Sequence, residues 1–195
     1  NNAGVSGTSG KPVWEAPQED WDWVFGVNFW GVLRGIRAFV PRMIANGEEG
    51  HIVNTASVAG LLTAADPYSV SKHAVVCLTE GLYKNFKTLN LKLSASVLCP
   101  GWVKTNIADA GRNRPAELGE VPDPSSLPAA VQAGLAAMRG MLQNGYQPSE
   151  IAQHVLDAIM TDTFFIIPAQ EYIQEAIKTR FDQVLKRENP TTGLF

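Results

Sequence analysis

Segments with helical spacing of apolar residues alternate along this chain with short runs typical of β-strands. A helix is predicted over about 20–45, with Pro41 expected to kink or end it. Further elements are predicted as strands at 51–56, 91–99 and 163–167 and as helices at 67–87, 128–143, 149–160 and 169–187. This order predicts an α/β fold with a parallel sheet, in a single domain over residues 1–195.

The helix ends carry their own signals. Asp66 is predicted to cap the helix that Pro67 begins, and Ser149 to cap the helix after Pro148. Residues 105–127 are rich in Gly, Pro, Asn and Ser, which predicts a mobile segment around at most one short helix. We expect the segment over about 102–145 to form the lid of a substrate site.

Composition excludes several classes of function. The 195 residues include 16 Lys and Arg against 19 Asp and Glu, a net charge of −3, without the basic cluster that nucleic-acid binding requires. The most apolar stretch, Val58–Ala65, is too short to span a bilayer. Cys77 and Cys99 lie in apolar runs, which predicts buried free thiols and a reducing, cytoplasmic location. Because no His, Cys and Asp residues have ligand spacing, we expect no catalytic metal.

Tyr68 and Lys72 carry the strongest chemical signal. Side chains four residues apart share one face of a helix, so the phenol and the ammonium can approach each other. A nearby positive charge favours the phenolate and moves the pKa of the tyrosine toward neutral pH. The pair is therefore a candidate for general acid–base catalysis.

Ser57 and Asn28 extend this candidate site. Ser57 follows the strand at 51–56, where its hydroxyl could bind a substrate oxygen. Asn28 interrupts an apolar helical stripe, so its amide needs partners: either a structural hydrogen bond to a strand or a water-mediated link to Lys72. Ligands of parallel sheets bind at the carboxyl ends of the strands, which places residues 1–4, Ser57 and residues 100–105 along one edge.

In their order and spacing, these motifs resemble the short-chain dehydrogenase/reductase family. The resemblance covers residues 1 to about 110 and rests on Asn1-Asn2-Ala3-Gly4, Val27-Asn28, the strand end Ile52–Ser57, Tyr68-x-x-x-Lys72 and Pro100-Gly101-Trp102-Val103-Lys104-Thr105. It implies a Rossmann-like, doubly wound parallel sheet and an oxidoreductase that uses NAD or NADP.

The resemblance also implies roles for individual residues. Tyr68 would be the general acid/base, Lys72 would lower its pKa and bind the nicotinamide ribose, and Ser57 would orient the substrate oxygen. Asn28 would hold a water of the proton relay. The implied cofactor contacts, besides Tyr68 and Lys72, are Asn2, Ala3 and Gly4 near the adenosine half and Pro100, Gly101, Val103 and Thr105 near the nicotinamide and phosphates.

One part of the family pattern is not found. The glycine-rich phosphate loop, the first strands and the residue that selects NAD or NADP precede the Asn-Asn-Ala-Gly motif in the family. Gly4-x-x-Gly7-x-x-Gly10 has the wrong spacing to replace that loop and is interpreted as an ordinary loop. We therefore expect this chain to be the C-terminal portion of the domain, with about 80–90 residues before it.

The segment after Pro100-Gly101 offers an apolar wall for a substrate. Its candidate substrate contacts, besides Ser57, are Trp102, Ile107, Met138, Met141 and Leu142, together with Leu127. They predict a hydrophobic or aromatic secondary alcohol or its ketone, although the same residues could only pack the lid onto the core. Two other functions stay open: a nucleotide-sugar epimerase or dehydratase, and a catalytically silent cofactor-binding or scaffold homologue.

A second apolar stripe on the first helix comprises Trp23, Val27, Trp30 and Leu33. One face is enough to join the core, so the second predicts either a subunit interface or a pair of tryptophans covered by the part of the domain that precedes this chain. The family resemblance implies a homodimer or homotetramer. His73, next to Lys72, is predicted to lie on the surface or at an interface.

Overall fold

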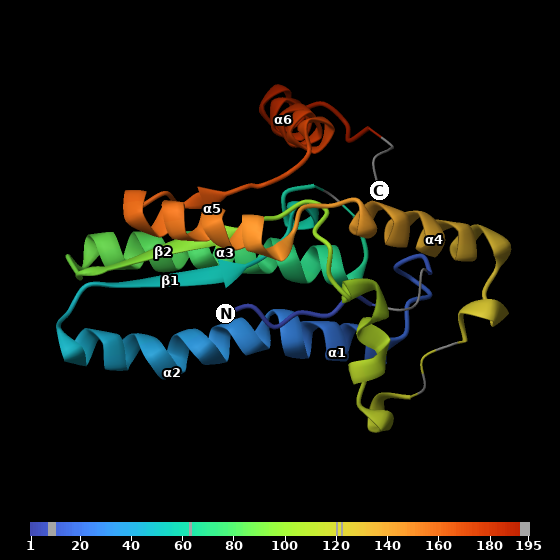
Figure 1. Ribbon diagram of the computed structural model, residues 1–195, viewed down its shortest axis with the longest axis horizontal. Coiled ribbons are helices and arrows are strands. Elements are labelled where there is room, and N and C mark those ends of the chain that lie inside the picture. Colours follow the sequence, from blue (N-terminus) through green and yellow to red (C-terminus); the bar gives the residue numbers. More distant parts are fainter. Residues whose placement is uncertain (8–10, 63, 120, 122, 192–195) are drawn as a thin grey trace.

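The computed structural model describes residues 1–7, 11–62, 64–119, 121 and 123–191. Its helices and strands are α1 (Gln18–Asn28), α2 (Trp30–Asn46), β1 (Gly50–Thr55), α3 (Pro67–Thr88), β2 (Leu93–Leu98), α4 (Ala129–Gln143), α5 (Pro148–Thr161), β3 (Phe165–Ile166) and α6 (Glu171–Lys186) (Figure 1). Short 3₁₀ helices are η1 (Val58–Gly60), η2 (Ile107–Asn113), η3 (Ala116–Leu118) and η4 (Pro124–Ser126). This succession confirms the predicted α/β architecture.

The strands form a parallel sheet in the order β1-β2-β3. The register of β1 and β2 runs from Gly50 opposite Leu93 to Thr55 opposite Leu98. The third strand is shorter than predicted, with only Phe165 and Ile166 in the ladder. Because the strands are parallel, their carboxyl ends meet at one edge of the sheet.

Helices cover both faces of this sheet. Side chains alternate between faces along a strand, and Ala95 and Val97 belong to the main core, with Val75 and Phe86 of α3. The neighbouring Leu98 faces the other way and packs with Ile151 and Ala158 of α5 and Ile166 of β3. This two-sided packing is the Rossmann-like, doubly wound arrangement that the sequence predicted.

The first helical region is one helix in the prediction and two in the structure, and Pro41 does not end the second of them. It is divided at Phe29 into α1 and α2, and Pro41 lies inside α2, which continues to Asn46. Pro41 is exposed, so water can hydrate the carbonyl that its missing N–H leaves without a partner. The division follows Asn28, whose buried amide bonds to the backbone of Val5.

The segment 105–127 contains more helical structure than the single short helix predicted. Three 3₁₀ helices, η2, η3 and η4, follow one another there.

Asp66 caps α3 by accepting a hydrogen bond from Ser69 N at 3.0 Å, as predicted. Ser149 does not cap α5, because Gln147 forms a capping box with Glu150 and Pro148 is the first helical residue.

The predictions on the two thiols and on His73 have different outcomes. Cys99 is buried, as predicted, but Cys77 is exposed. Cys77 lies on the side of α3 that faces solvent, whereas its neighbour Val76 is buried. His73 is exposed, as predicted. Residues 188–191 carry no regular element, while 192–195 and Gly10 lie outside the described residues. No helix in the described ranges is both long and apolar enough to cross a membrane.

Candidate active site

A cavity of about 1230 Å³ lies at the carboxyl edge of the sheet. The chain reaches this edge at Asn1, whose carbonyl accepts a hydrogen bond from Thr55 N at 2.9 Å. Predicted site residues that line the cavity are Asn2, Gly4, Ser57, Tyr68, Lys72, Pro100, Gly101, Trp102, Val103, Thr105, Ile107, Met138 and Leu142. Residues from three distant parts of the sequence are thus brought together at one edge.

Three of the predicted contacts lie outside the cavity. Ala3 is exposed and does not line it. Met141 is 40% exposed on α4, because the face toward the cavity is the one that carries Met138 and Leu142. Leu127 is likewise not part of the lining.

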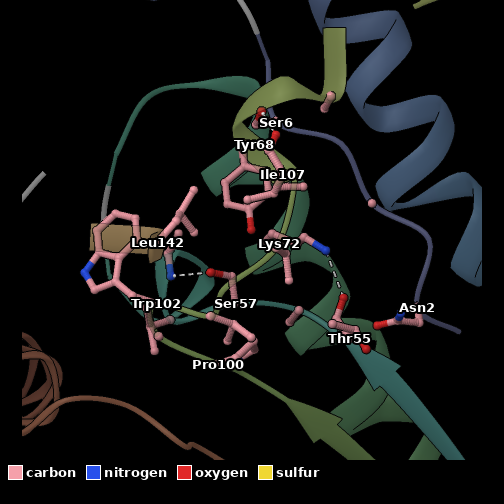
Figure 2. A pocket seen from close by; sticks show the side chains of 18 of the residues that line it. Asn2, Ser6, Thr55, Ser57, Tyr68, Lys72, Pro100, Trp102, Ile107 and Leu142 are labelled. Atoms are coloured by element: carbon pink, nitrogen blue, oxygen red, sulfur yellow. Dashed lines mark hydrogen bonds between the residues drawn. The ribbon is translucent and has the colours of Figure 1, made fainter. Parts of the chain in front are cut away.

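Tyr68 and Ser57 face each other across the cavity. Tyr68 lies in the first turn of α3, and its phenol oxygen points between Ser57 and Lys72 (Figure 2). Ser57 caps η1, where its Oγ accepts a hydrogen bond from Ala59 N at 3.2 Å. The helix cap therefore fixes the serine oxygen, and the hydroxyl hydrogen stays available for a second partner.

Lys72 is held just below the cavity surface. Its side chain is 3% exposed, and Nζ donates to Thr55 O at 2.9 Å. The same atom lies 5.7 Å from the centre of the Tyr68 ring. Burial lowers the pKa of Lys72 to about 8, so the amine is mostly protonated at neutral pH.

The pKa of Tyr68 corrects one expectation. Burial raises it above its ordinary value, which outweighs the lowering by the Ser57 hydroxyl, and Asp66 and Cys99 raise it further. The predicted lowering of the Tyr68 pKa is not found: burial is the largest effect on it, and Lys72, whose ammonium bonds to Thr55 O, is not among the groups that shift it. At neutral pH Tyr68 is therefore a neutral phenol, which is the form that can donate a proton.

Asn28 lies behind the cavity rather than in it. The residue is 0% exposed, and its amide bonds in both directions with Val5 and donates to Ser71 Oγ at 3.0 Å. Its partners are thus a backbone segment outside the strands and a serine of α3, not a strand as one interpretation had it, and the water-mediated link to Lys72 stays a prediction. A Cβ at Gly4 would lie 3.6 Å from Asn28 Oδ1 and 3.4 Å from Lys72 Nζ, so Asn28 holds the segment that covers the lysine.

Sequence reasoning missed much of the cavity wall. Ser6, Arg112 and an apolar row on α4 and α5 line it, the row comprising Val131, Leu135, Ile151, Ala152, Val155 and Leu156. The helical spacing of Ile151 and Val155 was visible in the sequence. Nothing in that spacing indicated which face of α5 points to the sheet edge.

Comparison with known proteins identifies this arrangement. The family model for short chain dehydrogenases matches residues 1–116. This chain belongs to the short-chain dehydrogenase/reductase family. A C alpha-dehydrogenase of Sphingobium sp. is 33% identical over 97% of the chain, and a CLA biosynthesis dehydrogenase/reductase of Lactiplantibacillus plantarum is 31% identical over 91%. The chain spans 60% and 63% of the lengths of these two relatives.

A solved structure of the family supports the fold over nearly the whole chain. The short chain dehydrogenase/reductase from Burkholderia phymatum is 37% identical, with a TM-score of 0.88 over 99% of this chain and 68% of that one. That relative was determined in complex with NAD. The chain is thus the partial Rossmann-like domain that the motifs predicted.

The site residues fit the ribose of a nicotinamide cofactor. An ammonium group has three N–H donors, and among the described residues Lys72 Nζ uses one of them, on Thr55 O. Lys72 and Asn2 both line the cavity, so the further donors of Nζ can meet hydroxyl groups of a ligand there (Figure 2). In the described ranges, no group of three or more His, Cys, Asp or Glu residues could hold a metal ion.

Proposed function

We propose that the polypeptide containing this chain is an NAD(P)-dependent oxidoreductase that interconverts a hydrophobic or aromatic secondary alcohol and its ketone. The observation that carries the proposal is the convergence of the Tyr68 phenol, the Ser57 hydroxyl and the Lys72 ammonium on one cavity. A nicotinamide dinucleotide, when bound, supplies the hydride donor or acceptor. The relatives named as dehydrogenases support the same class of reaction.

The chain's own residues account for the proton. In ketone reduction, Tyr68 donates its phenol proton to the carbonyl oxygen as hydride reaches the carbonyl carbon, and Ser57 donates a hydrogen bond to that oxygen. In alcohol oxidation the hydroxyl proton returns to Tyr68. The position of the Lys72 ammonium is set by Thr55 O, and its remaining N–H donors would bind the ribose hydroxyls of the cofactor.

The cavity walls support an apolar substrate. Trp102, Ile107 and Leu142 surround the space next to Tyr68, and α4 and α5 extend the apolar lining. Burying an aliphatic or aromatic group there contributes roughly 25 cal/mol per Å² of apolar surface. On the apolar lining that α4 and α5 contribute, a sugar would leave its hydroxyls without partners.

Activity of the natural polypeptide, including any sequence that precedes Asn1, tests the proposal. Aromatic and aliphatic alcohols and ketones are screened by nicotinamide absorbance, with NAD(H) and NADP(H) separately. Tyr68→Phe is expected to lower turnover by at least about 10²–10⁴-fold with unchanged cofactor affinity. Normal turnover of Tyr68→Phe would exclude the acid/base role. Cofactor binding without any turnover by the wild-type protein would favour the silent homologue.

Two methionines of α4 form a matched test of the substrate class. Met138 lines the cavity, whereas Met141, three residues later, is 40% exposed. Met138→Ala is expected to raise the KM for bulky apolar ketones, and Met141→Ala to leave it unchanged. Equal effects of the two variants would contradict an apolar substrate contact on this helix.

A homodimer or homotetramer is proposed as well, on the strength of the family resemblance and of exposed aromatic residues. The predicted stripe is only partly available, because Trp23 is 3% exposed and belongs to a core cluster with Val5, whereas Trp30 is 47% exposed. Light scattering tests this assembly: a Trp30→Lys variant is expected to lower the measured mass, and a monomeric wild-type protein would exclude it.

A further inference from the structure

We propose that Gln170 and Tyr172, where α6 begins, are positioning residues that orient the Trp102 indole, and that the oriented indole selects substrates with a planar aryl group on the reacting carbon. The selectivity part of this inference rests on the proposed oxidoreductase function. The positioning part rests on contacts between α6 and the segment that follows β2.

Gln170 holds the backbone of Trp102 on both of its polar groups. Trp102 N donates to Gln170 Oε1 at 3.3 Å, and Gln170 Nε2 donates to Trp102 O at 3.4 Å. The Gln170 amide thus bonds to the N–H and the carbonyl of Trp102 as a neighbouring strand would, although Trp102 lies after the end of β2. The approach requires Gly101, because a Cβ there would lie 2.5 Å from Gln170 Oε1 and 3.2 Å from Ala169 Cα.

Tyr146 makes a second, strand-like contact with the backbone of Trp102. Tyr146 N donates to Trp102 O at 2.9 Å, and Lys104 N donates to Tyr146 O at 2.9 Å. Val103 and Tyr146 accordingly form an isolated parallel bridge. The backbone at Trp102 is therefore fixed between the turn that precedes α5 and the start of α6.

Tyr172 fixes the indole ring itself. Trp102 Nε1 donates to the Tyr172 hydroxyl at 2.8 Å. A tryptophan side chain has two rotatable angles, so a fixed backbone and a fixed ring nitrogen together define the plane of the ring. Figure 2 shows the indole beside Leu142, with its nitrogen turned away from Tyr68. The surface left to the cavity is the apolar part of the ring.

The anchor of this arrangement is rigid. Ile173 and Ile177, one and two turns into α6, are 1% and 9% exposed and belong to the main core with Val97. Tyr172 itself is 47% exposed, so its hydroxyl contributes little to the core. A flat wall of defined orientation suits an aromatic ring, which gains about 0.5–1.5 kcal/mol from stacked or edge contacts, and discriminates less among flexible alkyl chains.

Tyr172→Phe tests the inference, because it removes the acceptor and keeps the ring. For the natural polypeptide with its cofactor, we expect the KM of an aryl ketone to rise about 3- to 10-fold, as loss of one hydrogen bond predicts, with little change in kcat. The KM of an alkyl ketone of similar hydrophobicity should change little. Tyr83→Phe is the control, because Tyr83 packs against Phe164 and does not line the cavity.

A double-mutant cycle separates positioning from a merely structural role. Trp102→Phe has no ring N–H, so adding Tyr172→Phe to it should have no further effect on KM. The fluorescence of Trp102, taken as the difference between wild type and Trp102→Phe, should shift and become easier to quench in Tyr172→Phe.

Two results would overturn the inference: an unchanged aryl-to-alkyl selectivity in Tyr172→Phe, or an equal loss in the Trp102→Phe background. Failure of the proposed function would look different. The wild-type protein would then turn over no carbonyl compound, which removes the selectivity claim, while the fluorescence shift would still confirm or refute the positioning of the indole.

Discussion

Asn28 and Val5 are joined by two hydrogen bonds of opposite direction: Val5 N donates to Asn28 Oδ1 at 2.9 Å, and Asn28 Nδ2 donates to Val5 O at 3.0 Å. The Asn28 amide thus bonds to the backbone of Val5 as a neighbouring strand would. Because Asn28 also donates to Ser71 Oγ, one side chain joins α1, α3 and the residues after Gly4.

Asn28→Leu is therefore expected to be destabilising. It leaves a buried N–H and a buried carbonyl of Val5 without partners, at about 1–3 kcal/mol each. Urea denaturation should show a lower midpoint with an unchanged slope. Asn144→Ala, which removes only an exposed bond to Gly140 O, is the control and should change stability by less than about 0.5 kcal/mol. A similar midpoint for both variants would contradict this role.

Lys72 predicts a pH dependence of stability. Its pKa is lowered from 10.5 to about 8, so between these values the unfolded chain binds a proton that the folded chain has released. The free energy of unfolding then rises with pH, by at most about 1.4 kcal/mol per pH unit. Below pH 8 the folded chain carries the full cost of the buried charge. The raised pKa of Tyr68 acts in the opposite sense above pH 10.

The measurement compares wild type with Lys72→Met from pH 7 to 9.5 by urea denaturation. The free energy of unfolding of Lys72→Met minus that of wild type should be highest at pH 7 and should fall as the pH rises toward 9.5. A difference that does not change with pH would show that the lysine keeps an ordinary pKa.

Gly60 lies where a side chain would meet the backbone of α3. A Cβ there would come within 2.7 Å of the Lys72 carbonyl carbon and oxygen and 2.9 Å of His73 N. Gly60→Ala should therefore cost about 1–3 kcal/mol, as overpacking does, and displace η1, which Ser57 caps. Thermal denaturation should show a lower melting temperature, and displacement of η1 should lower the activity of the proposed enzyme.

Gly81→Ala is the matched control. Gly81 lies inside α3, and a Cβ there would meet nothing within 4 Å. Alanine is the better helix former by about 0.5–1 kcal/mol, so this variant should be slightly more stable than wild type. Opposite signs for the two substitutions are expected; a loss of stability in both would contradict the contact argument.

Arg114 and Asp20 form a buried ion pair that ties η3 to α1, with side chains 6% and 3% exposed. Arg114 also donates to Leu118 O and lies 5.3 Å above the Trp23 ring. Arg114→Met should lower the free energy of unfolding by about 3–5 kcal/mol, because Asp20 loses its guanidinium partner. Arg114→Met combined with Asp20→Leu should recover most of the loss.

Arg139→Met provides the comparison for this pair. Arg139 and Asp109 are 44% and 57% exposed, and exposed pairs contribute about 0–1 kcal/mol. Denaturation of all three variants should rank the single Arg114 variant as the least stable. Equal stability of Arg114→Met and Arg139→Met would mean that burial of the first pair has no energetic consequence.

The site could be predicted to different degrees from the sequence. Tyr68, Lys72 and Ser57 meet as expected, because a helical repeat and the common edge of parallel strands follow from local periodicity. The aromatic residues of α1 show the limit. Trp23, expected at an interface, is covered by Val5 and Ala110.

Local patterns in the chain were enough to establish the α/β order, the parallel sheet and the family, since spacing and strand-end motifs are properties of neighbouring residues. Folding in three dimensions decided which face of each helix is covered, that Met138 rather than Met141 lines the cavity, and that burial raises the pKa of Tyr68. These outcomes depend on contacts between residues far apart in the chain, such as Trp102 with Tyr172, and on the water those contacts exclude.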